Sequence, residues 1–137
     1  MAESDKNVFE IEIITPDRVF YQGEASMIEF NTVEGEIGVY KNHIPLATVL
    51  APGIVTITEG DSKKYAAVHS GIGQILGDKV TLLAEIAEWP DEIDESRAKS
   101  AEERARERLE RKDSNLDVMR AELALRKALV RQEVLKK

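Results

Sequence analysis

The 137-residue chain contains no cysteine. This excludes a disulfide framework and any thiolate metal site, and it suits a reducing compartment. The chain also lacks any apolar run near the roughly 18 residues that a membrane-spanning helix needs. Its polar first residues predict neither a secretory signal nor a transit peptide. The length fits one ordinary domain, or one small domain with an appendage.

Glycine, proline and aromatic residues are missing from the last third of the chain. All 8 glycines, all 4 prolines and all 7 aromatic residues lie at or before Pro90. Residues 1–90 carry 14 acidic and 6 basic side chains, a net charge of −8, whereas residues 91–137 carry 12 acidic and 13 basic, a net charge of +1. We therefore divide the chain into domains 1–90 and 91–137. The overall charge of −7 disfavours a nucleic-acid partner.

Residues 8–90 alternate short apolar runs with turn residues every 8–12 positions, a pattern typical of an all-β sandwich or barrel. Phe9, Ile11 and Ile13 alternate with glutamates, so one face of this strand is predicted to be buried. The two-residue link Gly77-Asp78 predicts a hairpin. Eight to ten short, mostly antiparallel strands are expected, among them 25–31, 54–58, 65–69, 72–76 and 80–87.

No motif in residues 1–90 predicts catalysis. Gly71-Ile72-Gly73 is half of a dinucleotide fingerprint with strand-like residues behind it, so a bulge or a close approach of two backbones is the better interpretation. His43 and His69 lack the spacing of metal ligands, which favours a structural or partner-contacting role for each. The chain has neither a nucleophile elbow nor a phosphate loop. We expect no catalytic residue and no metal site.

The hydrophobic spacing changes after Pro90. Alanine and leucine then recur every three or four residues, which predicts a helix with one buried face formed by Ala98, Ala101, Ala105 and Leu109. The break at 113–115 separates this helix from a second one, with Ser114 as a capping residue and Asp117 as its partner. The second helix is expected to bury a stripe formed by Leu116, Met119, Leu123, Val130 and Val134.

A break this short makes the two helices antiparallel neighbours, with alanines of the first helix facing leucines of the second. Because alanines bury little area, the hairpin should be weakly packed and able to move. Acid–base pairs four residues apart add only a few tenths of a kcal/mol each. They are Glu95–Lys99, Glu102–Arg106, Glu107–Arg111 and Glu122–Arg126. The fold class is therefore α+β, an N-terminal antiparallel β-sandwich followed by a C-terminal antiparallel α-helical hairpin.

Four cations are expected to converge at the open end of this hairpin. Arg97 and Arg104 share one side of the first helix, together with two further arginines. Arg97 and Arg131 are equally far from the break, so they face each other when the hairpin folds, and Lys127 meets the neighbourhood of Arg104. Convergence beside Asp94 is unfavourable unless an anion or an acidic partner is present. A solvated charged face is the simpler alternative.

Three stretches of the chain resemble the epsilon subunit of the F-type ATP synthase. They are Phe9 to Asp17 with its Ile-Ile-Thr-Pro-Asp, Gly35 to Val39 followed by His43-Ile44-Pro45-Leu46, and Arg120 to Leu125. Their order and the layout of a sandwich followed by a hairpin cover essentially the whole chain. Lys41-Asn42 departs from the family, in which many members have Pro-Gly, and this changes one loop.

The resemblance implies a non-catalytic rotor subunit of the central stalk, which couples proton translocation to ATP synthesis. The sandwich of such subunits docks on the gamma subunit and on the ring of c subunits, at the periphery of the cytoplasmic side of the cell membrane. Their hairpin lies folded against the sandwich or extends along gamma. When it is extended, its basic side can meet an acidic loop of the beta subunits and block ATP hydrolysis.

A narrower resemblance concerns a nucleotide. The run Ile93-Asp94-Glu95-Ser96-Arg97-Ala98 is similar to the Ile/Leu-Asp-x-x-Arg-Ala motif of bacterial members that bind ATP as a regulatory ligand in the folded state. The resemblance implies an adenine end and a phosphate end of the site. The first would be surrounded by Glu88, Ile93, Asp94 and Ala98, and the second by Arg97, Arg104, Lys127 and Arg131. Lys127 stands where arginine is usual, and lysine lacks the planar fork of a guanidinium.

Two alternatives remain open. In the first, the chain is the same rotor subunit with a vestigial nucleotide motif, and its hairpin acts only as a mechanical brake. In the second, the chain is a small hydrolase or transferase with its pocket in the sandwich, against which stands the lack of any nucleophile–base–acid constellation. Heat released on adding ATP separates the regulatory site from the vestigial motif, and ATP turnover by the isolated chain would favour the enzyme.

Overall fold

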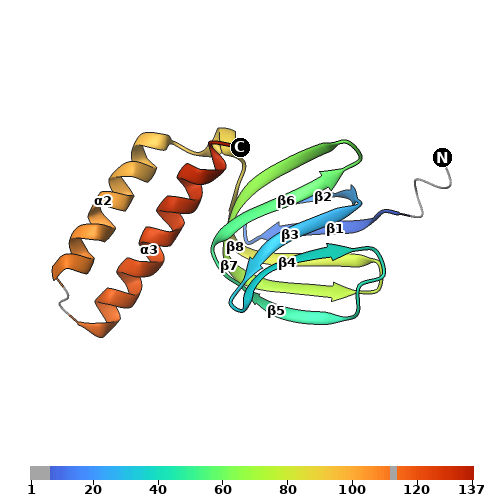
Figure 1. The fold of residues 1–137 in the computed structure, drawn as a ribbon, viewed down its shortest axis with the longest axis horizontal. Coiled ribbons are helices and arrows are strands. Elements are labelled where there is room, and N and C mark those ends of the chain that lie inside the picture. Colours follow the sequence, from blue (N-terminus) through green and yellow to red (C-terminus); the bar gives the residue numbers. More distant parts are fainter. Residues whose placement is uncertain (1–6, 112–113) are drawn as a thin grey trace.

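A computed structural model describes residues 7–111 and 114–137. Its strands are β1 (Phe9–Thr15), β2 (Arg18–Ala25), β3 (Met27–Thr32), β4 (Gly35–Tyr40), β5 (Leu46–Leu50), β6 (Gly53–Glu59), β7 (Ser62–Leu76) and β8 (Lys79–Glu88). A short 3-10 turn, η1 (Pro90–Glu92), leads to the helices α2 (Glu95–Arg111) and α3 (Asn115–Val134). Figure 1 shows the helices beside the strands, with α3 between α2 and the sandwich. The predicted α+β fold class is confirmed.

The sandwich encloses its core between strands that bury every second residue. The strand order is β2-β1-β8-β7-β5-β3-β4, and β6 pairs with both β3 and β7. In β1, Phe9, Ile11 and Ile13 are buried while Glu10 and Glu12 are half-buried, as the alternation predicts. All pairings are antiparallel except that of β1 with β8. The largest fully buried core side chains include Ile11, Ile13, Ile28, Phe30, Val39, Val55, Ile57, Val80 and Leu82.

β7 is the strand that joins the two layers. Its first half pairs with β6 and its second half with β5, while β8 follows it on both sides of a kink. The sequence predicted two separate strands, 65–69 and 72–76, and this prediction is wrong. The two runs form one strand of 15 residues because the pairing with β8 continues across the kink and holds both halves in register.

The kink lies at Ser70 and Gly71, whose φ angles are 60° and 136°. A Cβ atom on Gly71 would lie 2.1 Å from the carbonyl oxygen of Leu83. The expected close approach of two backbones at this glycine is therefore confirmed, and no other residue fits there. Gly77, with φ 63°, turns the β7–β8 hairpin at the predicted place.

The two helices pack on each other through alanines rather than through alanine and leucine. Ala98 and Ala105 of α2 are buried, as are Ala121 and Ala128 of α3. The predicted stripe is wrong at Met119 and Leu123, which are 67% and 39% exposed. Small side chains at a spacing of seven let the two backbones come close. The side chain of Leu116 lies outside the described residues.

Val130 and Val134 are buried, as predicted, but they pack against the sandwich and not against α2. They form a small apolar cluster with Ala67 of β7, and Ile54, Tyr65 and Ile93 surround it. This cluster is separate from the main core of the sandwich. The hairpin therefore rests on the sandwich through few apolar side chains, most of them from the last two turns of α3.

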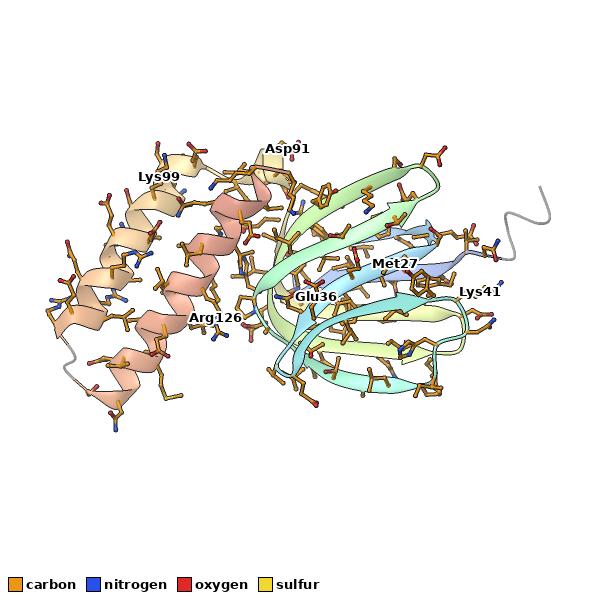
Figure 2. The ribbon with its side chains drawn as sticks, in the orientation of Figure 1. Met27, Glu36, Lys41, Asp91, Lys99 and Arg126 are labelled. Atoms are coloured by element: carbon orange, nitrogen blue, oxygen red, sulfur yellow. The ribbon has the colours of Figure 1, made fainter. Side chains whose placement is uncertain are left out.

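A short joint, residues 88–94, connects the sandwich to α2. The ring of Trp89 stacks on Phe20 of β2 with centroids 4.3 Å apart. The Glu92 carboxylate accepts hydrogen bonds from the guanidinium of Arg18 at 2.8 Å and from the backbone N–H of Trp89 at 2.9 Å. Figure 2 shows Asp91 at the top of this joint, between the helices and the strands. The start of α2 is thus tied to the sandwich.

Local predictions for the hairpin are confirmed in part. The Ser114 hydroxyl accepts a hydrogen bond from the backbone N–H of Asp117 at 3.1 Å, so it caps α3 as predicted. Two predicted ion pairs are present, Lys99–Glu95 at 3.5 Å and Arg106–Glu102 at 2.8 Å. The pairs predicted within 107–111 and 122–126 do not form within 4.0 Å in the described part of the chain.

Candidate functional site

A cleft of about 310 Å³ opens at the joint, between the end of β8 and the facing sides of α2 and α3. Seven of the eight site residues predicted from the sequence line it, and Glu92 and Ala101 complete its wall. The seven are Glu88, Ile93, Asp94, Arg97, Ala98, Arg104 and Arg131. The structure does not bring Lys127 into the cleft; this half-buried residue of α3 lies one turn further from the joint than Arg131.

Asp94 sets the position of the first arginine. Its carboxylate oxygen Oδ1 accepts a hydrogen bond from the backbone N–H of Arg97 at 3.1 Å, and its carbonyl oxygen accepts one from the N–H of Ala98 at 3.0 Å. Asp94 is therefore the residue at which α2 begins, and a carboxylate there suits the positive end of the helix dipole. Arg104 follows Arg97 at two helical turns, so both side chains line the same wall.

Arg131 reaches the cleft from the other helix and contacts the sandwich. Its Nε donates to Oε1 of Glu88 at 2.7 Å, and its Nη2 donates to Oε2 at 3.3 Å. Both side chains are about three-quarters buried, with 25% and 24% of their surface exposed. A guanidinium has five N–H donors, so three donors of Arg131 stay available after this double contact.

Glu88 is held from its other side by His69 of β7, a buried histidine on the sheet face that the hairpin covers. Nε2 of His69 lies 3.4 Å from Oε1 of Glu88. Burial alone would raise the pKa of the Glu88 carboxyl, but the hydrogen bonds from His69 and Arg131 outweigh it and lower the pKa to about 2. Glu88 is therefore an anion at neutral pH and acts only as an acceptor.

The carboxylates of the cleft have hydrogen-bond partners within the protein, but two of its arginines have no acidic partner in the part of the chain that the structure describes. Neither Arg97 nor Arg104 has an acidic side chain within 4.0 Å among the described residues. The carboxylate of Glu92 is engaged by Arg18, whose hydrogen bond is the main cause that lowers the pKa of Glu92. Each acid of the cleft already accepts protein hydrogen bonds, whereas two of its guanidiniums keep their full capacity to donate. This arrangement favours an anionic ligand with several acceptor oxygens.

Neither Glu92 nor His69 was assigned to the site from the sequence, and Ala101 was placed only near the converging cations. The pairing register of the predicted β7–β8 hairpin could have shown that His69 lies near Glu88. Pairing across Gly77-Asp78 places Ala67 opposite Glu88, and His69 then lies diagonal to Glu88 on the same face. Ala101 could have been found from its helical spacing to Ala98. In residues 7–111 and 114–137, no group of three or more His, Cys, Asp or Glu side chains is placed to hold a metal ion.

Comparison with known families identifies the chain. A family model described as "ATP synthase, Delta/Epsilon chain, beta-sandwich domain" matches residues 8–90, and one described as "ATP synthase, Delta/Epsilon chain, long alpha-helix domain" matches residues 91–136. The chain belongs to this family. As a member it is a non-catalytic stalk subunit of an ATP synthase, so its work is done by binding and by position rather than by chemistry.

Individual relatives agree over most of the chain. The chain is 44% identical over 125 residues to an ATP synthase epsilon chain of Halalkalibacterium halodurans, which covers 90% of this chain and 94% of the relative. It is 42% identical over 130 residues to one of Caldanaerobacter subterraneus, with 94% of each covered. Neither α2 nor α3, as far as the structure describes them, is long and apolar enough to cross a membrane.

Solved structures share the fold. A chain of the Euglena gracilis mitochondrial ATP synthase, from a structure of its OSCP, F1 and c-ring, superposes with a TM-score of 0.80 at 24% identity, covering 95% of this chain and 80% of that one. A chain of the Tetrahymena thermophila enzyme, from a structure of its central stalk and c-ring, gives a TM-score of 0.62 at 12% identity, covering 92% and 95%.

Proposed function

We propose that the chain is a rotor subunit whose hairpin is a regulatory element held folded by ATP. The observation that carries this proposal is the cleft at the joint, where three arginines from both helices surround a space of about 310 Å³ beside the sandwich. A ligand there contacts β8, α2 and α3 at once, so it binds only when the hairpin is folded. Binding then shifts the hairpin toward the folded state.

The phosphate end of ATP fits the arginine side of the cleft. Arg97 and Arg104 lack an acidic partner among the described residues, and Arg131 has three N–H donors left beside its contact with Glu88. Guanidiniums bind phosphate oxygens through paired hydrogen bonds. Arg97 and Arg104 supply positive charge without an acidic partner to the phosphates, and no cluster of acids among the described residues is placed to hold a metal ion of the site's own. We place Lys127 outside the first contacts.

The adenine end fits the joint. Ile93 and Ala98 offer apolar surface, and Glu88 offers carboxylate oxygens that can accept from an amino group. Asp94 has a different task from the one that the resemblance implies, because its carboxylate already caps α2. We propose that it shapes the wall by fixing the first turn of the helix, with its second oxygen free to meet the base.

The outer face of the sandwich supports docking on the gamma subunit. An apolar band crosses five neighbouring strands, because each of its residues lies directly opposite the next in the sheet. Its members are Val49, Ile72, Leu83, Ile14 and Val19, and all but the half-buried Ile14 are exposed. A contiguous apolar patch of this kind marks a protein–protein interface. We assign it to gamma.

The end of the sandwich away from the helices supports contact with the ring of c subunits. Figure 2 shows Lys41 at this end. Exposed apolar side chains gather around the loop that follows it, namely Tyr40, Ile44, Leu46 and Leu76. With this end on the ring, the subunit sits peripherally on the cytoplasmic side of the cell membrane, and the hairpin points toward the catalytic part of the enzyme.

The opposite state of the hairpin is the inhibitory one. In the part of the chain that the structure describes, its attachment to the sandwich includes a small apolar cluster, the Arg131–Glu88 pair and Lys137 above the ring of Tyr65. Once released, α2 presents Arg97, Arg104, Arg108 and Arg111 along one side, and these arginines meet the acidic loop of a beta subunit. ATP therefore opposes inhibition by occupying the cleft.

Isothermal titration calorimetry of the isolated chain with ATP tests the proposal. We expect saturable heat that magnesium does not increase, and its loss in the double variant Arg97→Ala, Arg131→Ala. Arg106→Ala and Arg108→Ala are matched controls, since both arginines lie on α2 outside the cleft. Unchanged affinity in the double variant would remove the proposed site.

A second candidate is the same rotor subunit with a vestigial motif and a purely mechanical hairpin. Two observations favour it: Lys127 is outside the cleft, and Glu88 already neutralises Arg131. In this case the Arg131–Glu88 pair and the apolar cluster hold the hairpin without a ligand. Millimolar ATP would then give no heat, while the chain would still co-purify with gamma.

A further inference from the structure

His69 is a polar side chain that packing alone does not explain. It is fully buried in β7, and its Nδ1 atom has no hydrogen-bond partner among the described residues. A buried polar atom without a partner is destabilising, and a leucine of similar size would fill the same space without that loss. The one polar contact that compensates is made by Nε2, 3.4 Å from Oε1 of Glu88.

The direction of this contact follows from the acceptor. Glu88 is ionised, so its oxygens can only accept, and Nε2 of His69 must carry the proton. In the tautomer with its proton on Nε2, the ring has a lone pair, rather than an N–H group, unpaired at Nδ1. An acceptor without a hydrogen-bond partner is tolerated in protein interiors more often than an N–H donor without one. The imidazole lies on the face of the sheet that the hairpin covers, together with Ala67, and it thereby points one donor at a carboxylate on the wall of the cleft.

The carboxylate in turn holds the hairpin. Arg131–Glu88 is the one ion pair that joins a helix to the sandwich in residues 7–111 and 114–137. Oε1 of Glu88 meets both Nε2 of His69 and Nε of Arg131. Fixing this oxygen therefore fixes the plane of the guanidinium and the direction of its three remaining donors.

We propose that His69 is a positioning residue: its buried Nε2–H holds the Glu88 carboxylate in the orientation that captures Arg131, so that the sheet face beneath the hairpin sets both the docking of the hairpin and the presentation of Arg131 in the cleft. The effect on docking stands without any nucleotide. The effect on nucleotide affinity rests on the proposed function, and separate measurements address the two.

Docking is measured on the full chain by the distance between two nitroxide labels. Because the protein has no cysteine, labels at Asp61→Cys and Glu103→Cys, both exposed, are specific. We expect His69→Leu to lower the ratio of docked to undocked hairpin about tenfold, the loss expected from a weakened hydrogen bond to a charged group. His69→Gln, whose amide can donate from a similar place, restores most of it. A docked fraction in His69→Leu equal to that of the parent would overturn the proposal.

Two control experiments distinguish a positioning role of His69 from a general contribution to stability. Ile75→Val alters a buried residue of the same strand away from the cleft and should lower stability without changing the docked fraction. In a Glu88→Gln background, His69→Leu should have no further effect on docking. A merely structural role would give equal effects in both backgrounds, and that result would contradict the proposal.

The nucleotide is tested separately by titrating ATP into the same variants. We expect His69→Leu to weaken binding about tenfold and His69→Gln to recover it. If the parent chain binds no ATP, the proposed function is wrong. The label distances still decide whether His69 positions Glu88 for docking. Nitrogen-15 NMR gives a direct signature, because the chain has only two histidines. The Nε2–H tautomer is expected for His69, and an Nδ1–H tautomer would overturn the proposal.

Discussion

The sandwich and the hairpin are stabilised by different interactions. The sandwich buries large aliphatic and aromatic side chains in one continuous core, and its strands bond to one another along their length. The hairpin is joined internally by four alanines and attached to the sandwich by a few side chains. Since burial of apolar area is the main favourable term in folding, the sandwich resists change and the hairpin does not. The difference fits the proposal that the sandwich is a rigid docking part and the hairpin a movable one.

The largest expected effect is a loss of stability in the sandwich, from a substitution at the kink of β7. Gly71→Ala places a Cβ against the Leu83 carbonyl oxygen and keeps a positive φ, so it should lower the free energy of unfolding by about 3–5 kcal/mol. Urea denaturation followed by circular dichroism measures this loss. Gly60→Ala is the control, since its φ is 60° but nothing lies within 4 Å, and it should cost only about 1–2 kcal/mol. Equal losses would refute the close approach.

A second prediction concerns the four buried alanines between α2 and α3. Ala128→Leu forces a larger side chain between the helices and should destabilise the hairpin by about 2 kcal/mol. Backbone amide exchange should become faster in α2 and α3 and stay unchanged in β1 and β8. Met119→Leu, at an exposed position of the same helix, should change stability by less than about 0.5 kcal/mol. Faster exchange throughout the sandwich would show that the two parts unfold together.

The attachment of the hairpin should depend on pH through Glu88. Its pKa is lowered to about 2 in the docked state, from an ordinary value of 4.5. Docking therefore favours the ionised carboxylate; its contribution is complete above about pH 4.5 and is lost as the pH falls toward 2. Label distances recorded across this range should show the hairpin leaving the sandwich, with docking in Glu88→Gln weaker and insensitive to pH. A parent chain that stays docked at pH 2 would contradict this assignment.

The cap of α3 is expected to give the smallest effect. Ser114→Ala removes the acceptor for the N–H of Asp117 and should cost about 1 kcal/mol or less, all of it in the first turn of the helix. Exchange of the Asp117 amide is the measurement. Ser100→Ala, at an exposed position inside α2, is the control and should be near neutral. An unchanged Asp117 amide would mean that the hydroxyl does not cap the helix.

Much of this structure could be predicted because its signals are local. Alternating residues fixed β1, Gly77 marked a hairpin, and Ser114 marked the start of a helix. Counting from the break placed Arg97 opposite Arg131, and both line the cleft. These predictions needed only the periods of strands and helices and the chemistry of turns.

The errors concern which surfaces meet. Ser70-Gly71 was interpreted as the end of a strand, because a positive φ does not reveal that a neighbouring strand continues past it. The side of α3 that faces the sandwich holds its valines, while its alanines face α2, and apolarity alone does not distinguish these two partners. His69 was interpreted as a structural or partner-contacting residue and not as part of the site, because its contact is with a carboxylate 19 residues away.

The stack of Trp89 on Phe20 gives the protein an optical reporter of its own. This is the one tryptophan in the chain, and it stands between Glu88 of the cleft and the turn that leads into α2. Because the ring is anchored on the sandwich next to Glu88 in the chain, it stays in place when the hairpin leaves, while the Arg131 guanidinium is withdrawn from the Glu88 carboxylate. Its emission should then change with the local charge, so the rate of hairpin release can be followed in unlabelled protein.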